Sequence, residues 1–136
     1  MDVEKFFKEC LINMGYVTFE IAKKLKEKGY PFNTSHHYDK DGNIIVALCD
    51  YDERCEYPMP EIHQVLKWLR EEHHLHCEVV GAAYGYNLII SDTPDKGGTD
   101  RYYSHANNDG PNYAGAWDKY EDCVMYGIEY VLDNLI

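Results

Sequence analysis

The chain has 136 residues, of which 45% are apolar, and its 24 carboxylates outnumber 13 lysines and arginines to give a formal net charge of −11. This length suits a single domain, residues 1–136, whose core needs neither disulfides nor a structural metal. The longest apolar run, Ile44–Cys49, is far shorter than the roughly 20 residues of a membrane-spanning helix. Acids outnumber bases by twelve to three between Glu71 and Ile136, which disfavours direct binding of DNA or RNA and favours a protein partner with a basic surface.

Two helices are predicted at the start of the chain. The first spans 2–14 and ends at Gly15. Its apolar residues lie on one stripe, which we expect another part of the protein or a partner to cover, and which comprises Val3, Phe6, Phe7, Cys10, Leu11 and Met14. The second spans 18–28 and ends at Gly29 and Pro31. Its outer face is rich in lysine, and its inward residues are Ile21, Ala22 and Leu25.

A hairpin is predicted after the second helix. Residues 33–39 and 43–50 flank Lys40-Asp41-Gly42, and an Asp-Gly pair between two extended runs is a strong hairpin signal. The second of these strands is apolar on both faces. It is therefore expected to be a central strand or to be covered on both sides.

A third helix and a second hairpin follow a polar, acidic segment at 50–59. Pro60 opens the helix, and the inward stripe comprises Ile62, Val65, Leu66 and Leu69. Strands over 75–83 and 86–92 then meet at Tyr84-Gly85. Turn residues at 93–98 precede a short edge strand at 101–104.

The last helix follows a loop at 105–116. Asp118 and Glu121 have the spacing of a capping box, which places the start of the helix at this pair. Gly127 lies within the inner stripe of the helix, where glycine costs about 1 kcal/mol relative to alanine. This glycine is therefore predicted to permit the close approach of a strand or another helix.

Together these elements predict an α+β fold built from two helix–hairpin units. Residues 21–28 align with residues 65–72 without a gap, and a predicted hairpin follows each of them. We therefore expect one antiparallel sheet of four or five strands, packed with helices that include the N- and C-terminal ones. Coincidence between two amphipathic helices is the alternative to a duplication, because the identities are few.

Several blocks of the chain resemble a set of small proteins encoded in prophages and mobile elements of gut anaerobic bacteria. The blocks are Tyr16–Gly29, Val65–Glu72, Trp117–Asp122, Gly127–Tyr130 and Leu132–Ile136. The matching positions are chiefly helix stripes and caps. The resemblance therefore implies a shared fold, and it brings no established activity, cofactor or site residue with it.

Two groups of metal-ligand residue types stand out, and neither predicts a metal. The first is His73, His74, His76 and Cys77. All four cannot converge, because His74 turns away from His73 on the helix while His76 and Cys77 face opposite sides of a strand, although two of them could meet a third ligand from elsewhere. The second is Asp92, Asp95, Asp100 and Asp109 with Gly97 and Gly98, which resembles a loose calcium loop without EF-hand spacing. An acidic, solvated turn is the favoured interpretation, and no cofactor is expected.

The five cysteines are odd in number and show no CxxC spacing, which favours buried thiols over a disulfide framework or a zinc knuckle. Cys49 or Cys55 can be paired with His36, His37 or His63 as nucleophile and base. No motif fixes any of these pairs, however, and nothing supplies an oxyanion hole. No catalytic residue is therefore assigned, and enzyme activity is the less favoured hypothesis.

A tyrosine-rich stretch before the last helix is the preferred recognition patch. Tyrosine offers a large contact area with few rotatable bonds, which is why interfaces are enriched in it. The patch consists of Asp100, Tyr102, Tyr103, Asn107, Asn108, Asp109 and Tyr113. The alternative is that these rings roof a small core.

The sequence as a whole favours a small acidic, non-catalytic protein that binds a protein partner with a basic surface. A phage or mobile-element accessory protein that inhibits a host factor is one version of this function. A small-ligand-binding protein or enzyme with a pocket beside the 105–116 loop is the alternative. The acidic start of the chain lacks the features of a secretory signal, which predicts a cytoplasmic protein, and the first helix offers a stripe for homo-oligomer formation.

Overall fold

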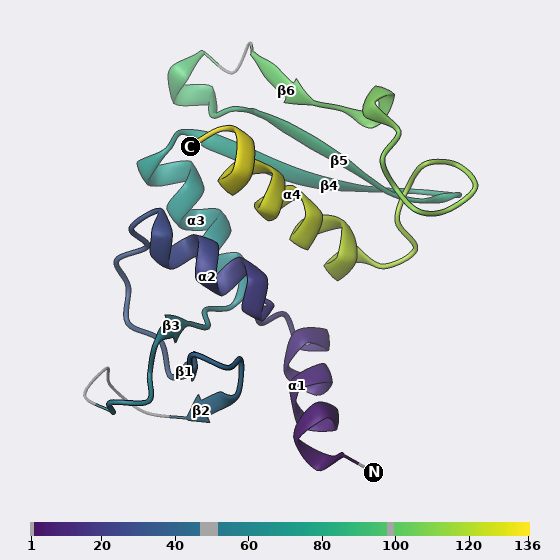
Figure 1. Cartoon of the computed structure of the whole chain (residues 1–136). Coiled ribbons are helices and arrows are strands. Elements are labelled where there is room, and N and C mark those ends of the chain that lie inside the picture. The colour runs from purple at the N-terminus through teal and green to yellow at the C-terminus, as the bar shows by residue number, and fades with distance from the viewer. Residues whose placement is uncertain (1, 47–51, 98–99) are drawn as a thin grey trace. The chain divides into compact units, whose positions relative to one another are not determined.

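The computed structural model describes residues 2–46, 52–97 and 100–136 and shows a mixed α+β chain (Figure 1). The described residues form four α-helices and two three-stranded antiparallel sheets. This corrects the predicted single sheet of four or five strands, because the strands pair in two separate sets of three. None of the helices in the described ranges combines the length and apolar character needed to cross a bilayer.

The chain divides into two compact units. Unit 1 comprises Met1–Gln64 with Ile136, and unit 2 comprises Val65–Leu135. Each unit contains one of the two sheets. The single domain, 1–136, and the duplication of a helix–hairpin unit stay predictions.

Unit 1 begins with two helices whose ends lie within two residues of the predicted positions. α1 (Val3–Asn13) follows Asp2, whose carboxylate accepts a backbone hydrogen bond at 3.1 Å. α2 (Phe19–Glu27) follows Thr18, whose hydroxyl accepts one at 3.3 Å. These side chains satisfy amide groups that the first turn of a helix leaves without a partner. The predicted inward residues of α2 are all buried: Ile21, Ala22 and Leu25.

The apolar stripe of α1 is largely exposed, which differs from the expected covered face. Leu11 is the only buried residue of the stripe, while the exposed fraction reaches 74% at Val3 and 71% at Met14. Near the buried Leu11, one turn earlier on the helix, the Lys8 ammonium lies 5.9 Å from the centroid of the Tyr38 ring. The helix therefore packs by one edge of its stripe.

The sheet of unit 1 has the order β2-β1-β3 and is formed by β1 (His36–Tyr38), β2 (Ile44–Val46) and β3 (Tyr57–Pro58). The strand expected at 43–50 was predicted to be central or to be covered on both faces, and its described part is neither, because β2 lies at an edge of the sheet and Val46 is 63% exposed. β1 is central instead, because β3 pairs with it on the side opposite β2. Residues 47–50 lie outside the described part of the chain.

Two buried tyrosines in unit 1 predict a loss of stability in alkali. Burial raises the pKa of Tyr30 to about 12, and burial also raises the pKa of Tyr38, whose hydroxyl donates to the Val17 carbonyl at 2.7 Å. Above pH of about 10, where unfolded tyrosine ionises, the folded state therefore holds more protons, and the free energy of unfolding falls as pH rises. We expect these two tyrosines to add no pH dependence near neutrality and to make stability fall steeply above pH of about 10.

The measurement is tyrosinate absorbance followed together with circular dichroism during an alkaline titration. Part of the tyrosinate signal is expected to appear only as the folded signal is lost. Denatured protein supplies the control, since all 13 tyrosines should then ionise in one step. Complete ionisation before any loss of folded signal would contradict the burial argument.

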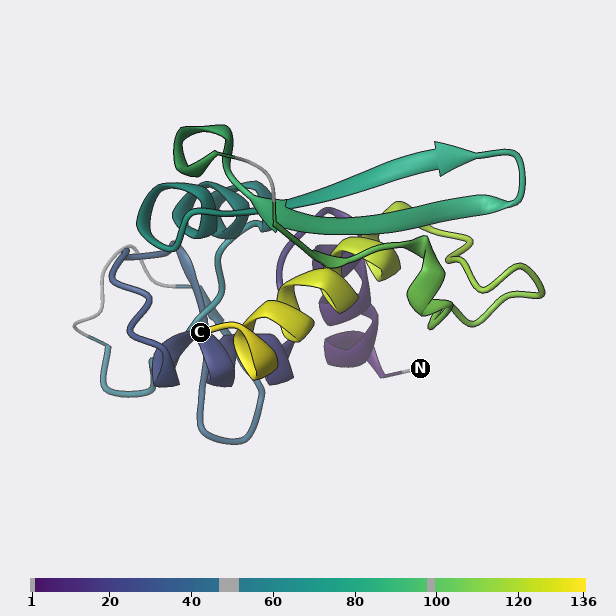
Figure 2. The same cartoon turned by 90° about the horizontal axis from the view of Figure 1, so that it is seen from above.

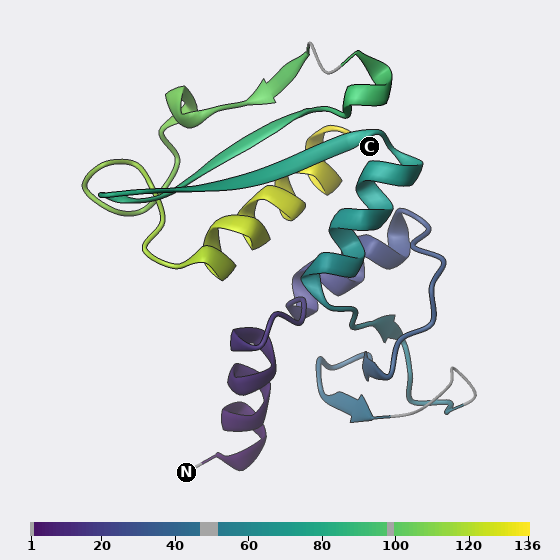
Figure 3. The same cartoon turned by 180° about the vertical axis from the view of Figure 1, so that it is seen from behind.

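The sheet of unit 2 carries a helix along one face, as Figure 2 and Figure 3 show from two further directions. Its order is β4-β5-β6, with β4 (Leu75–Ala82), β5 (Gly85–Asp92) and β6 (Arg101–Tyr103). The β4–β5 register runs from Leu75 opposite Asp92 to Ala82 opposite Gly85, so the predicted second hairpin is present. α3 (Ile62–Glu72) precedes this sheet in the chain, and α4 (Tyr120–Asn134) covers it.

α4 lies close to the sheet at Gly127. A Cβ atom at this position would lie 2.7 Å from Leu88 Cδ1 on β5, and Leu88 is fully buried. The predicted close approach of a strand at Gly127 is therefore confirmed. The helix also buries a row of larger residues, which comprises Cys123, Val124, Met125, Ile128, Val131 and Leu132.

The predicted capping box at the start of α4 is wrong. The N-cap residue is Lys119, whose side chain makes no capping hydrogen bond. Asp118 lies one residue too early to cap the helix, and its carboxylate instead accepts a hydrogen bond from the side chain of Asn112 at 3.0 Å. Asp118 is therefore tied to the preceding loop.

Candidate functional site

A structured loop joins β6 to α4 and carries several residues of the predicted patch; we call residues 104–119 the β6–α4 loop. It starts with a short 3-10 turn, η2 (His105–Asn107), capped by Ser104, whose hydroxyl accepts a backbone hydrogen bond at 3.3 Å. The Asn107 side chain accepts one from the Ser104 amide at 3.2 Å, and Asn108 ends the turn with a left-handed φ of 55°. Both asparagines therefore shape the loop.

Asn112 holds the middle of the loop with four hydrogen bonds. Its side-chain oxygen accepts from the amides of Ala114 at 2.9 Å and Ala116 at 3.0 Å. Its side-chain nitrogen donates to the Tyr84 carbonyl at 2.9 Å and to the Asp118 carboxylate at 3.0 Å. The amide group thus uses its two donor hydrogens and two acceptor positions, and it links the loop to the β4–β5 turn.

Two glycines allow the loop to fold back on itself. Gly115 has a φ of +71°, which side chains other than glycine rarely adopt, and a Cβ atom there would overlap the side chain of Asn108. A Cβ atom at Gly110 would overlap the backbone of Ala116. The Gly110 amide donates to the Gly115 carbonyl at 3.0 Å, so the two ends of this turn are joined directly.

The end of the loop is attached to β5 by a short backbone bridge. The Tyr86 amide donates to the Trp117 carbonyl at 2.7 Å, and the Trp117 amide donates back to the Tyr86 carbonyl at 3.1 Å. The Trp117 side chain is buried against Tyr126 of α4, with ring centroids 5.0 Å apart. The sheet and the helix therefore both fix the path of the loop.

Asp109 anchors the first half of the loop through two tyrosines. The hydroxyls of Tyr103 and Tyr126 donate to the same carboxylate oxygen at 2.9 Å and 3.0 Å. Burial, and next the hydrogen bond to Asp109, raise the pKa of Tyr103, and the same two causes raise the pKa of Tyr126. Tyr103 is only 2% exposed, which corrects its predicted place on the surface of the patch.

Tyr103 is thus the one buried residue of the predicted patch, and the other six are exposed. Tyr113 is 92% exposed and Tyr102 is 39% exposed, and Asp100 also lies at the surface. The Tyr102 hydroxyl donates to the Asp92 carboxylate at 2.7 Å, which fixes this ring against the sheet. Tyr113 is the most exposed of the large apolar and aromatic residues that the structure describes.

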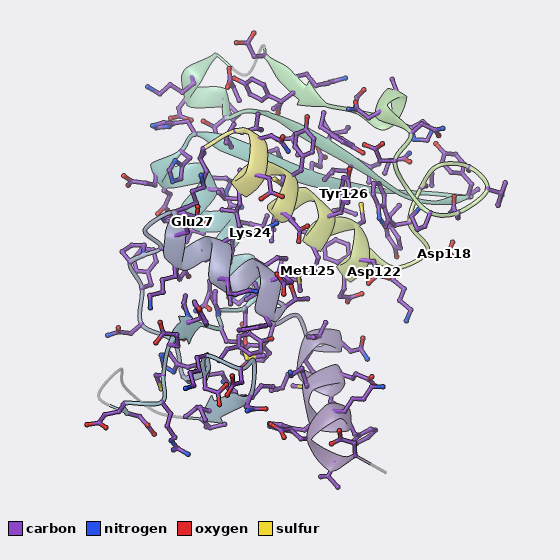
Figure 4. All side chains as sticks on the ribbon, in the orientation of Figure 1. Lys24, Glu27, Asp118, Asp122, Met125 and Tyr126 are labelled. Atoms are coloured by element: carbon purple, nitrogen blue, oxygen red, sulfur yellow. The ribbon has the colours of Figure 1, made fainter. Side chains whose placement is uncertain are left out.

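Negative charge surrounds this loop along the chain. From Asp100 to Asp122 five carboxylates stand against two bases, Arg101 and Lys119. Figure 4 shows Asp118 before α4 and Asp122 and Tyr126 on its first turns. An exposed tyrosine on a fixed, acidic loop is suited to contact a basic surface.

The histidines near the end of α3 are held apart. The His73 ring meets Trp68 edge-on, with ring centroids 4.7 Å apart. His74 Nδ1 instead lies 3.2 Å from the Asp95 carboxylate. Cys77 is buried, and burial raises the pKa of its thiol to about 12, which keeps it protonated at neutral pH.

The carboxylates of the predicted acidic turn have separate partners. Asp92 accepts from Tyr102, Asp95 lies against His74, and Asp109 accepts from Tyr103 and Tyr126. Within 2–46, 52–97 and 100–136 there is no group of three or more His, Cys, Asp or Glu side chains placed to hold a metal ion. Gly98 lies outside the described residues.

One of the nucleophile and base pairs considered from the sequence lines a single pocket. Cys55 and His37 line the same pocket in unit 1, which has a volume of about 270 Å³. His63 lies instead beside Glu61, with 3.1 Å between the ring nitrogen and the carboxylate, and Cys49 lies outside the described residues. The pocket expected beside the 105–116 loop stays a prediction.

Sequence reasoning missed Asn112 as the organising residue of the loop. One local signal was present, because asparagine side chains commonly accept a hydrogen bond from the amide two residues later, as Asn112 does from Ala114. Its other partners include Tyr84, which is 28 residues away in the chain. A contact over that separation requires the fold to be known.

Comparison of the chain with protein-family models, with curated proteins and with solved structures finds no match. The functions of the loop and the pocket are therefore inferred from the geometry of these two sites alone.

Proposed function

We propose that the protein is a non-catalytic interaction module whose β6–α4 loop binds a basic surface on a protein partner. The observation that carries this proposal is Tyr113, which is 92% exposed on a loop fixed by internal hydrogen bonds. An exposed aromatic ring on a flexible loop would lose much of its binding energy to ordering. A loop that is already ordered avoids most of that cost.

The chemistry of the loop supports a protein partner. Tyrosine is a frequent anchor at protein interfaces because it has a large ring, a polar tip and few rotatable bonds. The carboxylates around the loop add attraction to lysine and arginine, which raises the association rate and makes binding sensitive to salt. The exposed members of the proposed surface are Asp100, Tyr102, Asn107, Asn108, Asp109 and Tyr113. Asn107 and Asp109 also hold its shape through hydrogen bonds.

The wider biological proposal rests on the resemblance to small prophage and mobile-element proteins. In that setting the protein acts in the cytoplasm as an accessory protein, and an acidic inhibitor of a host factor is one form of the activity. Homo-oligomer formation through the exposed stripe of α1 also stays a prediction.

A truncation of Tyr113 tests the proposed surface. In affinity capture from host lysate with elution by salt, Tyr113→Ala is expected to lower recovery of the partner about tenfold, as loss of a central interface tyrosine does. Because this ring is almost fully exposed, thermal stability should not change. Tyr113→Phe should keep most of the binding.

Val46→Ala is the matched control, since Val46 is a well-exposed apolar residue in unit 1. It is expected to leave the captured partner unchanged. Equal recovery with Tyr113→Ala and with the unmodified protein would overturn the assignment to this loop. Tight binding of oligonucleotides at ordinary ionic strength would overturn the preference for a basic protein partner.

A further inference from the structure

A second candidate site lies in unit 1, away from the β6–α4 loop in the chain. The pocket of about 270 Å³ is walled by the end of α2, the segment that follows it, β1 and β3 (these elements are seen in Figure 3). Its lining combines aromatic rings with one carboxylate, one lysine and one histidine, and it includes Lys26, Tyr30, Phe32, His37, Glu56 and Tyr57. This volume is close to the lower limit for small-molecule sites.

The pocket already positions an ammonium group from its own chain. The Lys26 ammonium lies 2.8 Å from the Glu56 carboxylate and 5.2 Å from the centroid of the Tyr57 ring. A carboxylate beside the face of an aromatic ring is the chemistry that recognises organic cations. Lys26 therefore marks the place where the charged head of a ligand would bind.

The aromatic walls are held by rings next to them. Tyr57 meets Phe19 edge-on at a centroid distance of 5.6 Å, and Tyr30 meets Phe32 edge-on at 5.5 Å. Tyr30 is buried, whereas Phe32, which also lines the pocket, is 56% exposed. The pocket thus offers a fixed aromatic wall and one ring that a ligand can cover.

Displacement of Lys26 from Glu56 has a low cost. The two side chains are 51% and 44% exposed, and ion pairs with that exposure contribute little to stability because water screens them. An incoming ammonium group would take over the contact with Glu56, while the Lys26 ammonium would return to water. The exchange therefore preserves one cation at the carboxylate.

We propose that this pocket binds an organic ammonium group carried on a short apolar stem. Such a group can come from a free small amine or from a lysine side chain of another polypeptide, and both share the same contacts with Glu56 and Tyr57. The proposal does not depend on the function assigned to the β6–α4 loop, because every residue of the pocket belongs to unit 1.

The experiment is a titration of the full chain followed by amide chemical shifts in nuclear magnetic resonance spectra. The probes are choline, its neutral analogue in which a tert-butyl group replaces trimethylammonium, and lysine with both ends blocked. At least one cation is expected to shift the amides of Phe32, Glu56 and Tyr57 at millimolar concentration, and the neutral analogue is not. Binding of choline alone identifies a small amine, and binding of blocked lysine alone identifies a polypeptide side chain.

Two variants of the ion pair sharpen the test. Glu56→Gln should weaken cation binding about tenfold, because it removes the charge that the ligand contacts. Lys26→Ala should strengthen binding by up to about fivefold, because it removes an internal competitor that is held only weakly. Glu27→Gln is the matched control: Glu27, labelled on α2 in Figure 4, does not line the pocket.

A chemical readout covers the case in which a variant perturbs folding. Cys55 lines the same pocket and is half-buried, so its alkylation rate can be followed by peptide mass mapping in the unmodified protein. A bound cation is expected to slow alkylation at Cys55 and to leave Cys10 unaffected. Equal effects of the neutral analogue and the cations, or no shift with either cation, would overturn the proposal.

Discussion

Replacing Asn112 by aspartate is expected to destabilise the β6–α4 loop by about 2 kcal/mol, although the side chain keeps its size and shape. The introduced carboxylate can still accept from the amides of Ala114 and Ala116. On its other side, an oxygen would replace the nitrogen that now donates to the Tyr84 carbonyl and to the Asp118 carboxylate. Two hydrogen bonds would thus become two contacts between acceptors.

The measurement is urea unfolding of Asn112→Asp at several pH values. The introduced carboxyl faces another carboxylate, so its pKa should lie higher in the folded state than in the unfolded state. The folded state then binds the extra proton more tightly, and the loss of stability should shrink as pH falls toward about 4. A loss that is constant over this range would contradict the repulsion.

A second substitution at Asp118 provides the matched control. In Asn112→Asp with Asp118→Asn the donor and the acceptor of this hydrogen bond change places, and part of the stability should return. Asp118→Asn alone should have a small effect, because the amide can still present an oxygen to Asn112. If the double variant were as unstable as Asn112→Asp, the contact between these two residues would not be the cause. Partner recovery should follow stability across this set if the fixed loop is what binds.

The helices were predictable because their apolar residues repeat with the period of a helix. Ile21, Ala22 and Leu25 gather on one face of α2 whatever the rest of the chain does, and all are buried. β3 was not predictable, because the two residues Tyr57–Pro58 are too few to show a period. Because β3 pairs with β1, β1 is the central strand, and β2, which was expected to be central or covered on both faces, lies at an edge.

Strand pairing also decides which residues of the candidate surface are exposed, and the sequence alone does not give that pairing. Tyr102 and Tyr103 are adjacent and chemically identical, so the sequence cannot decide which one faces outward. Successive residues of a strand point to opposite faces, and the pairing of Tyr103 with Ile90 of β5 sets which face is buried. The high tyrosine content of the stretch was enough to find the segment that carries Tyr113. Deciding which of its tyrosines are exposed and which are buried required the register between β5 and β6.

Alanine at Gly127 is expected to have opposite effects on stability in two backgrounds. In the unmodified protein the added methyl group would press on Leu88, and overpacking of a filled core costs about 1 to 3 kcal/mol. This cost equals or exceeds the gain of about 1 kcal/mol in helix propensity from glycine to alanine. Gly127→Ala alone should therefore leave the protein no more stable than before, or less stable.

The result should reverse once Leu88 is shortened. Leu88 is fully buried, so Leu88→Ala should cost about 3 kcal/mol by leaving a cavity beside Gly127. In that background the methyl group of Gly127→Ala enters free space, and the helix propensity of alanine should raise stability by about 1 kcal/mol.

The measurement is a double-mutant cycle of unfolding free energies in urea, with an expected coupling of about 1 to 3 kcal/mol. Leu75→Ala is the matched control, because Leu75 is buried on the same sheet but is not among the nearest neighbours of a Cβ atom at Gly127. Its effect should add to that of Gly127→Ala. Additive effects with Leu88→Ala as well would mean that Gly127 is required for some reason other than contact with β5. A coupling confined to Leu88 would instead establish that this glycine exists to let α4 lie directly on the strand, which positions the loop that leads into the helix.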